Sequence, residues 1–278
     1  MKAIVVMSAV TSFLIRSGDW SYDNLDEWPE TCLNGTTQSP INLEKASATR
    51  RNFSEIVFNN FYNVNVTLQN TGHTVQVTIS EDDQNTLSPN ITGGVFGTNY
   101  YFLDNLHFHW NSEHTIDGYR YPLEGHFLLY NHSYGNITNA LNYIHGFAVI
   151  SVMYEIEDSC TYNSFEDITE TIDDISKNVS VSVRLRNKIS IHSLLPTTTN
   201  KVFVYNGSLT TPDCNEGALW VVLEEPSCIK QSQYEKLSGI YSDRDALVEQ
   251  NTRPLQDLYG REILYSGTAA MKKKFVRL

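Results

Sequence analysis

Short runs in which apolar and polar residues alternate constrain this 278-residue chain more than any other feature of its sequence. A period of two is typical of strands with one buried face, and the runs are rich in the β-formers Val, Ile, Thr and Tyr. Residues 61–68 and 73–79 flank the segment Gln69-Asn70-Thr71-Gly72, which predicts a hairpin. Further strands are predicted at residues 100–110, 119–130, 147–156, 201–205 and 218–223.

Helical periodicity is confined to two stretches, residues 164–177 and 231–238. The predicted fold class is therefore mainly β (α+β): a single domain built on a large twisted, mostly antiparallel central sheet with peripheral short helices. With 41% hydrophobic residues the chain can bury such a core, and no internal boundary divides it. Residues 20–42, rich in Pro, Gly, Asn and Thr, are expected to wrap the surface as an extended arm.

The first residues resemble a short secretory signal, with Lys2 followed by a largely apolar run from Ala3 to Ile15. We therefore predict a signal peptide at 1–16 and a folded domain at 17–278 that ends in a short basic tail at 272–274. A buried first strand is the alternative for the apolar run, because a single lysine is a weak signal. No other stretch approaches the roughly 18 apolar residues of a membrane span.

Charge, sequons and cysteines bear on partners and compartment. The 32 acidic and 20 basic residues give a formal charge of −12, which argues against nucleic-acid binding. Four cysteines without Cys-x-x-Cys spacing suit two disulfides in an oxidising compartment, with three pairings open. We expect a secreted, monomeric glycoprotein with glycan acceptors among Asn34, Asn52, Asn65, Asn90, Asn131, Asn136, Asn178 and Asn206.

The segment Leu106-His107-Phe108-His109-Trp110 is the strongest chemical signal in the chain. In a strand, His107 and His109 point to one face and can meet one ion. His126 follows after a turn-like segment, so a hairpin would bring it beside the pair. Glu124 stands two residues before His126, and Asn105 two before His107, each able to accept the imidazole's other N–H. Three neutral histidines leave one tetrahedral position open, as in a catalytic zinc site; copper or a purely structural ion is the alternative.

Six segments together resemble the alpha carbonic anhydrases, in order and over nearly the whole chain after the leader. They are Gln38-Ser39-Pro40-Ile41-Asn42, Asn70-Thr71-Gly72-His73, His107-Phe108-His109-Trp110, Ser112-Glu113-His114-Thr115, Glu124-Gly125-His126 and Ser208-Leu209-Thr210-Thr211-Pro212. The resemblance implies zinc-dependent reversible hydration of carbon dioxide to bicarbonate and a proton. It departs from the vertebrate pattern in a shorter stretch from His109 to Glu113, and in Leu128 and Asn105 where valine and glutamine are common.

Residue roles follow from this resemblance. It implies zinc ligands at His107, His109 and His126, orienting carboxylates at Glu113 and Glu124, and a hydroxyl at Thr210 that bonds the nucleophile. His73 matches the proton-shuttle position, although it can equally be an ordinary exposed histidine. A disulfide between Cys32 and Cys214 matches extracellular members. We expect Cys160 to pair with Cys228, because each follows a predicted strand and adjacent strand ends can bring the two together. The apolar wall for the substrate would comprise Leu128, Val149, Leu209, Thr211 and Trp220.

Two other functions compete with this one. A catalytically silent carbonic-anhydrase-related binding or adhesion protein shares the fold, but its feature is the loss of a zinc ligand, and all three histidines are present here. A secreted esterase is the third reading, since zinc-activated water can attack activated esters, and no Gly-x-Ser-x-Gly segment suggests a serine nucleophile. An open zinc position also predicts inhibition by sulfonamides.

Overall fold

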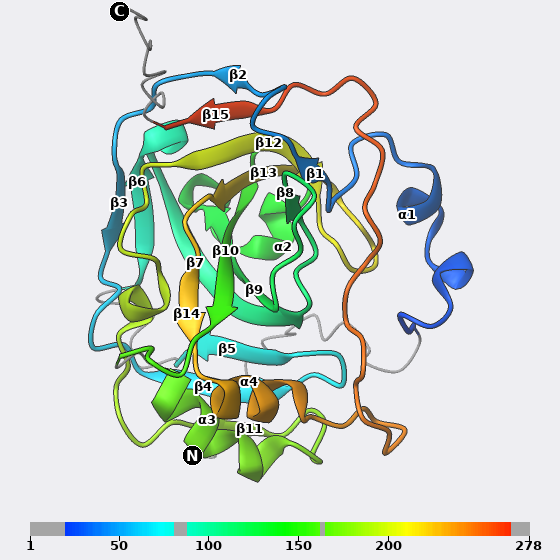
Figure 1. The fold of residues 1–278 in the computed structure, drawn as a ribbon, viewed down its shortest axis with the longest axis vertical. Helices are drawn as coiled ribbons and strands as arrows, with labels where there is room; N and C mark the ends of the chain where they lie inside the picture. The colour runs from blue at the N-terminus through cyan, green and yellow to red at the C-terminus, as the bar shows by residue number, and fades with distance from the viewer. Residues whose placement is uncertain (1–19, 81–87, 162–164, 268–278) are drawn as a thin grey trace, which may run out of the picture.

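The computed structural model describes residues 20–80, 88–161 and 165–267, so the predicted signal peptide at 1–16 and the basic tail at 272–274 lie outside it. Within the described residues, thirteen strands form one twisted sheet that fills the middle of the molecule (Figure 1). Its main path runs in the order β11 (Ser182–Arg184), β4 (Val66–Asn70), β5 (Val75–Ile79), β7 (Gly97–Trp110), β9 (Leu123–Asn131), β10 (Phe147–Ile156), β13 (Glu216–Leu223), β12 (Val202–Ser208), β15 (Leu264–Ser266) and β2 (Thr49–Arg50).

The remaining elements surround this path. Strands β3 (Ile56–Asn59) and β6 (Asn90–Gly93) pair beside β7, β14 (Ser227–Ile229) pairs with β10, and β1 (Asn42–Leu43) pairs with β8 (Thr115–Ile116). The helices are peripheral and short: α1 (Glu30–Asn34), α2 (Ile137–Ala140), α3 (Phe165–Ile175) and α4 (Gln231–Ser238), with 3-10 turns η1 (Leu25–Glu27), η3 (Gly94–Phe96), η4 (His132–Tyr134) and η5 (Ile191–Leu194).

The predicted fold class is confirmed. Most neighbouring strands are antiparallel, and the parallel exceptions in the large sheet are β10 with β13, β10 with β14, and β15 with β2. Helices α3 and α4 fall on the two stretches with helical periodicity. Helices α1 and α2 were not predicted, because four or five residues are too short to show a period. Among the described residues, no helix has both the length and the apolar character that crossing a bilayer requires.

Several strand boundaries differ from the predicted ones, most of all at N-terminal ends: the strand predicted at residues 61–68 is β4, which begins at Val66. The prediction began one strand at Tyr119, but β9 begins at Leu123, because Asp117 and Gly118 adopt positive φ and close a turn from Ile116 to Tyr119. The second hairpin strand was expected from His73, but β5 begins at Val75.

Side chains of the turn itself keep His73 out of the strand. Asn70 Oδ1 accepts from Gly72 N at 2.8 Å, and Thr71 Oγ1 accepts from His73 N at 3.3 Å and from Thr74 N at 3.1 Å. Gly72 supplies the positive φ of +86° that the turn needs. His73 therefore lies at the tip of the hairpin between β4 and β5.

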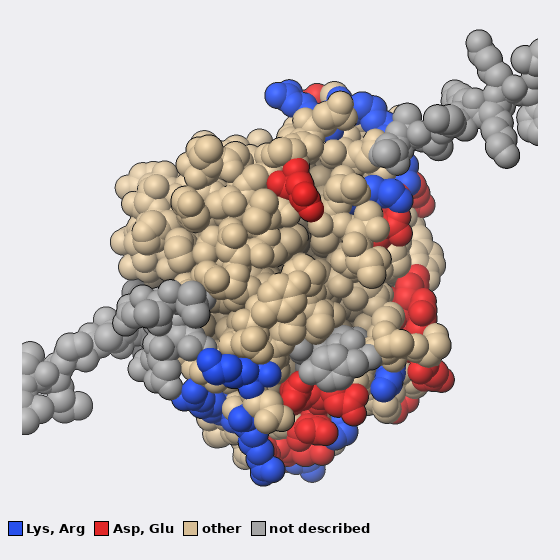
Figure 2. All heavy atoms as spheres, turned by 90° about the vertical axis from the view of Figure 1, so that its left-hand side faces the viewer, with Lys and Arg blue, Asp and Glu red and all other residues tan. Residues whose placement is uncertain are grey.

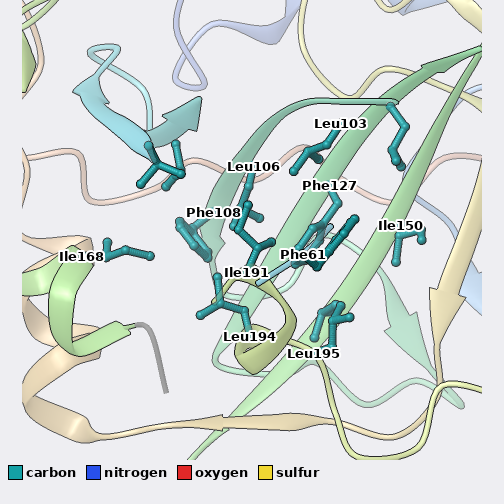
Figure 3. Close-up of a cluster of buried hydrophobic side chains, with 14 of the residues drawn as sticks. Phe61, Leu103, Leu106, Phe108, Phe127, Ile150, Ile168, Ile191, Leu194 and Leu195 are labelled. Carbon is teal, nitrogen blue, oxygen red and sulfur yellow. The ribbon is translucent and has the colours of Figure 1, made fainter. Parts of the chain in front are cut away.

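The sheet separates two apolar clusters because alternate residues of β7, β9 and β10 point to opposite faces. Phe108, Phe127 and Ile150 belong to the larger cluster, in which Figure 3 shows Phe108 between β7 and Ile168 of α3. Leu128 and Val149, one position along their strands, belong to the smaller cluster on the other face. Burying a phenylalanine such as Phe108, which has no exposed surface, contributes about 1.5–3 kcal/mol.

On the face shown in Figure 2, charged side chains lie at the lower end, along the right-hand edge and at the top right. Figure 2 shows Lys, Arg, Asp and Glu together at the lower end of one face, the end where Figure 1 places α3 and α4. There Lys236 Nζ lies 3.0 Å from Asp173 Oδ2. Exposed pairs of this kind contribute at most about 1 kcal/mol. Helix α3 is therefore held mainly by its buried face of Phe165, Ile168, Ile172 and Ile175.

The N-terminal arm and the C-terminal segment lie on the same side of the sheet (Figure 1). A disulfide joins Cys32 of α1 to Cys214, which follows β12, and a second joins Cys160 to Cys228 of β14. The buried Arg253 guanidinium donates to Cys32 O and to Ser39 O. These contacts join the N-terminal arm to the loop that follows β12 and to the C-terminal segment that contains Arg253, beside the centre of the sheet.

Candidate metal centre

Three histidines meet on adjacent antiparallel strands. The register of β7 and β9 places His107 opposite His126 and His109 opposite Glu124. One ring nitrogen from each histidine lies within 4.8 Å of the other two. His109 and His126 are buried and His107 is half-buried. The strands thus bring together the three side chains that the sequence singled out as metal ligands.

The other ring nitrogen of each histidine has an oxygen partner. His107 Nδ1 lies 2.8 Å from Asn105 Oδ1, His109 Nδ1 lies 2.6 Å from the Asn251 carbonyl, and His126 Nε2 lies 2.7 Å from Glu124 Oε1. Oxygens of this type accept, so each of these nitrogens carries the proton. The lone pairs left over are those of His107 Nε2, His109 Nε2 and His126 Nδ1.

Two observations show that this triad fits a zinc ion. His109 Nε2 is buried and has no hydrogen-bond partner among the described residues, an arrangement that is costly unless something else satisfies it. Burial also lowers the pKa of all three histidines, that of His109 to about 4, so the rings are neutral at pH 7. Neutral imidazoles with orienting oxygen partners are ligands that zinc prefers.

Glu124 is the most heavily bonded carboxylate of the site. Besides His126, its Oε1 accepts from His114 Nδ1 and from Ser151 Oγ, both at 2.7 Å, and its Oε2 accepts from His114 N at 2.9 Å. Burial alone would raise its pKa, but His114 and His126 outweigh burial and hold the pKa well below its usual range. Glu124 is therefore ionised and acts as an acceptor for every donor around it.

A chain of hydrogen bonds extends from Glu124 to the N-terminal arm. His114 Nε2 lies 2.6 Å from Tyr205 Oη, and Tyr205 Oη lies 2.8 Å from Ser39 Oγ. Since His114 donates through Nδ1 to Glu124, its Nε2 accepts from Tyr205. The tautomer of His114 is set in this way from both sides, and the chain anchors Glu124 to three other segments of the fold.

Glu113 is buried beside the metal-facing nitrogens of the triad. Its Oε1 accepts from Arg253 N at 2.8 Å, and its Oε2 lies 3.6 Å from His109 Nε2 and 3.9 Å from His126 Nδ1. Burial raises the pKa of Glu113 to about 7, while His126 and a hydrogen bond from Thr210 are among the effects that lower it. The structure thus brings Thr210 and Glu113 together beside the metal-facing nitrogens.

An apolar wall lies on the same face of the sheet. Leu128, Val149 and Trp220 are buried in the smaller cluster, and the half-buried Leu209 packs against it. Trp220 Nε1 donates to Ser208 O at 2.9 Å, which fixes its ring beside the β12 loop. Thr211 is half-buried in that loop, where its carbonyl accepts from Cys214 N. Four of the five expected wall residues therefore pack together, and Thr211 lies next to them.

His73 lies apart from the triad and is stacked on another ring. Its imidazole lies 3.8 Å from the Trp20 ring, centroid to centroid, with 12° between the planes. Its Nε2 has no hydrogen-bond partner among the described residues, and burial lowers its pKa below 6.5. Its carbonyl accepts from Asn251 Nδ2, so one residue connects the His73 turn to His109.

Asn251 is the site residue that sequence reasoning missed. It is fully buried, and it holds His109 through its carbonyl and Trp110 N through Oδ1. It lies in an irregular segment 142 residues after His109, and a backbone carbonyl leaves no trace in the residue type. The partners of Glu124 other than His126 were also missed, for the same reason of distance along the chain.

A central twisted sheet that carries three histidines able to hold one metal ion is the arrangement of the carbonic anhydrase class. The family profile described as eukaryotic-type carbonic anhydrase matches residues 19–267, and the chain belongs to this family. It is 28% identical to carbonic anhydrase 6 of Mus musculus, covering 95% of this chain and 92% of that protein. It is 30% identical to carbonic anhydrase 15 of Mus musculus (92% and 86% covered) and 32% identical to a carbonic anhydrase of Pectobacterium atrosepticum (84% and 82%).

Proposed function

We propose that this protein catalyses the zinc-dependent, reversible hydration of carbon dioxide to bicarbonate and a proton. The observation that carries the proposal is the triad itself: three neutral ring nitrogens within 4.8 Å, each opposite nitrogen bonded to an oxygen. Zinc bound there would lower the pKa of a coordinated water toward 7, the magnitude established for this class of enzyme, and so supply a nucleophile at neutral pH.

The residues around the triad would orient the reactants. Glu113 accepts from Arg253 N through Oε1, and its Oε2 is buried without a hydrogen-bond partner among the described residues, 3.6 Å from His109 Nε2. In the proposed arrangement the Thr210 hydroxyl donates to this carboxylate. A threonine hydroxyl that donates to Glu113 can only accept from the attacking water, which orients the attacking lone pair. We assign Thr210 and Glu113 this positioning of the nucleophile.

The apolar wall would receive the substrate. Carbon dioxide has no net charge and few groups to bond, so a small hydrophobic surface beside the nucleophile suits it better than charged side chains. Leu128, Val149, Leu209 and Trp220 provide that surface, with Thr211 at its edge. Sulfonamide inhibitors, whose deprotonated nitrogen suits both the zinc and Thr210, would occupy the same space.

Each turnover must also remove a proton, and we propose that His73 carries it. A histidine titrates near neutrality, and the Nε2 of His73 is buried but has no hydrogen-bond partner among the described residues, so no other protein group occupies its lone pair. Its pKa lies below 6.5 because of burial, which speeds release to solvent but weakens capture.

We further propose that the protein acts outside the cell. Disulfides form and persist in oxidising compartments, and both pairs of cysteines are bridged. Of the eight sequon asparagines, Asn34, Asn52, Asn136, Asn178 and Asn206 are exposed, which suits the expected glycosylation.

Measurement of zinc content and carbon dioxide hydration on one purified sample tests the proposal. We expect one zinc per chain and stopped-flow activity, both lost in His126→Ala. His132→Ala removes an exposed histidine outside the triad and serves as the matched control, with zinc and activity unchanged. Equal zinc occupancy in wild type and His126→Ala after dialysis would contradict the ligand assignment. Zinc without hydration activity would favour the silent binding protein.

A further inference from the structure

An irregularity in β7 lies three residues before the first histidine of the triad. Along β7 and β9, Leu103 pairs with Leu129, but the next pair is Asn105 with Leu128. One residue of β7, Asp104, therefore has no counterpart on β9, which is the signature of a β-bulge. A bulge interrupts the alternation of faces, so consecutive side chains can lie near each other.

The bulge places a carboxylate against the amide that holds His107. Asn105 Nδ2 donates to Asp104 Oδ2 at 2.9 Å, while Asn105 Oδ1 lies 2.8 Å from His107 Nδ1. Among the described residues, no other side chain donates a hydrogen bond to Asp104, and no cation pairs with it. Asp104 is half-buried, and this burial raises the pKa of its carboxyl group above the usual range. A carboxylate in this setting has one partner, Asn105.

The chemistry of an amide explains why such a partner matters. The oxygen and nitrogen ends of an asparagine side chain have nearly the same shape, so the amide can flip by rotation of about 180° and still fit the same site. If Asn105 turned its NH₂ toward His107, the imidazole would have to accept at Nδ1 and carry its proton on Nε2. That tautomer has no lone pair left for a metal on the side of His109 and His126. An ionised carboxylate only accepts, so it binds the NH₂ end alone.

We propose that Asp104 is a positioning residue for the metal centre: it fixes the orientation of the Asn105 amide and thereby keeps the proton of His107 on Nδ1. Its charge also polarises the amide, which strengthens the carbonyl as an acceptor for His107. The effect on zinc rests on the proposed metal site, whereas the effect on the His107 tautomer exists in the metal-free protein. The sequence pair Asp104-Asn105 acts as one unit because of the bulge.

The first test measures the tautomer without metal. Nitrogen-15 NMR of metal-free wild type should show His107 protonated at Nδ1 alone. In Asp104→Ala we expect a mixture of both tautomers, and in Asp104→Asn, which keeps the size of the side chain and guards against misfolding, a smaller admixture. Asp174→Ala, an exposed acid on α3, is the matched control and should leave the spectrum of His107 unchanged. A single Nδ1–H tautomer in all variants would overturn the proposal.

The second test is a double-mutant cycle on zinc affinity, measured by competition with a chelator. Loss of a side chain that bonds a zinc ligand directly lowers zinc affinity by about 10–100-fold. Asp104 is one hydrogen bond further from the metal, so we expect Asp104→Ala to lower zinc affinity by about 3–10-fold. In an Asn105→Ala background, Asp104→Ala should change the zinc dissociation constant by less than about twofold. The same loss in both backgrounds would show a general effect on the fold and refute the positioning role. If wild type binds no zinc, the proposed function fails while the tautomer result still decides the role of Asp104.

Discussion

Replacing Glu124 by glutamine separates hydrogen bonding from charge at the centre of the site. The carboxylate accepts from His126, His114 and Ser151 through Oε1 and from the His114 backbone through Oε2. Glutamine can keep its carbonyl where Oε1 stands and retain the three side-chain bonds. Its NH₂ then faces the backbone N–H of His114, so two buried donor groups, that N–H and the NH₂ itself, have no acceptor. The reverse orientation would strand three donors, so we expect the first.

The magnitudes follow from that count. Each buried unsatisfied donor group costs about 1–3 kcal/mol, so the two in metal-free Glu124→Gln should lower its unfolding free energy by about 2–6 kcal/mol. Neutral acceptors bond less strongly than charged ones, so His126 becomes a weaker ligand and zinc affinity falls by about 10-fold, or about 1.4 kcal/mol. Glu124→Ala strands all four donors. It should therefore lose about twice as much stability or more, and about 100-fold in zinc affinity.

Urea unfolding of the metal-free proteins and chelator competition for zinc at pH 7 measure the two quantities separately. Glu170→Gln changes an exposed glutamate of α3 in the same way and is the control for charge alone. The reasoning is refuted if Glu124→Gln loses as much zinc affinity as Glu124→Ala, because the three retained bonds would then count for nothing. Unchanged stability in Glu124→Ala would equally refute the count of buried donors.

Four further outcomes are expected. The double substitution Cys32→Ser and Cys214→Ser should lower the unfolding free energy by a few kcal/mol. Loop closure over a separation of 182 residues sets an upper value of about 5 kcal/mol. An unchanged urea midpoint would contradict this expectation. A sulfonamide should inhibit hydration by taking the open position beside Thr210, and full activity at millimolar inhibitor would count against an open site. His73→Ala should lower kcat in dilute buffer, spare kcat/KM and recover with added imidazole; an unchanged kcat would assign proton transfer to another route. Because burial disfavours the charged ring, His73 should titrate by NMR below pH 6.5, and its contribution to stability should be lost as the pH falls through that lowered pKa.

Prediction from the sequence was most successful where neighbours along the chain decide the geometry. The period of two puts His107 and His109 on one face of β7, and it puts Glu124 beside His126 on β9. Alternation also places Phe108 on the opposite face of β7 from these histidines. It predicts the sheet as well, because the face to which a side chain points depends only on its position in the strand. Boundaries were less accurate, because side chains of a turn, such as those of Asn70 and Thr71, end a strand without changing its apolar pattern.

The sequence by itself therefore determined which residues could form the site, namely three histidines and the partners of His107 and His126 at i−2, and the class of sheet that carries them. Only the tertiary structure decided how those residues are held: the Asn251 carbonyl on His109, the link from Glu124 through His114 to Tyr205, and the stacking of His73 on Trp20. Backbone carbonyls and bulges carry no residue signature, and contacts between separate segments, such as that of His109 with Asn251 at a distance of 142 residues along the chain, depend on the packing of the whole chain. The ligands are encoded locally, whereas their tautomers and environment are properties of the complete fold.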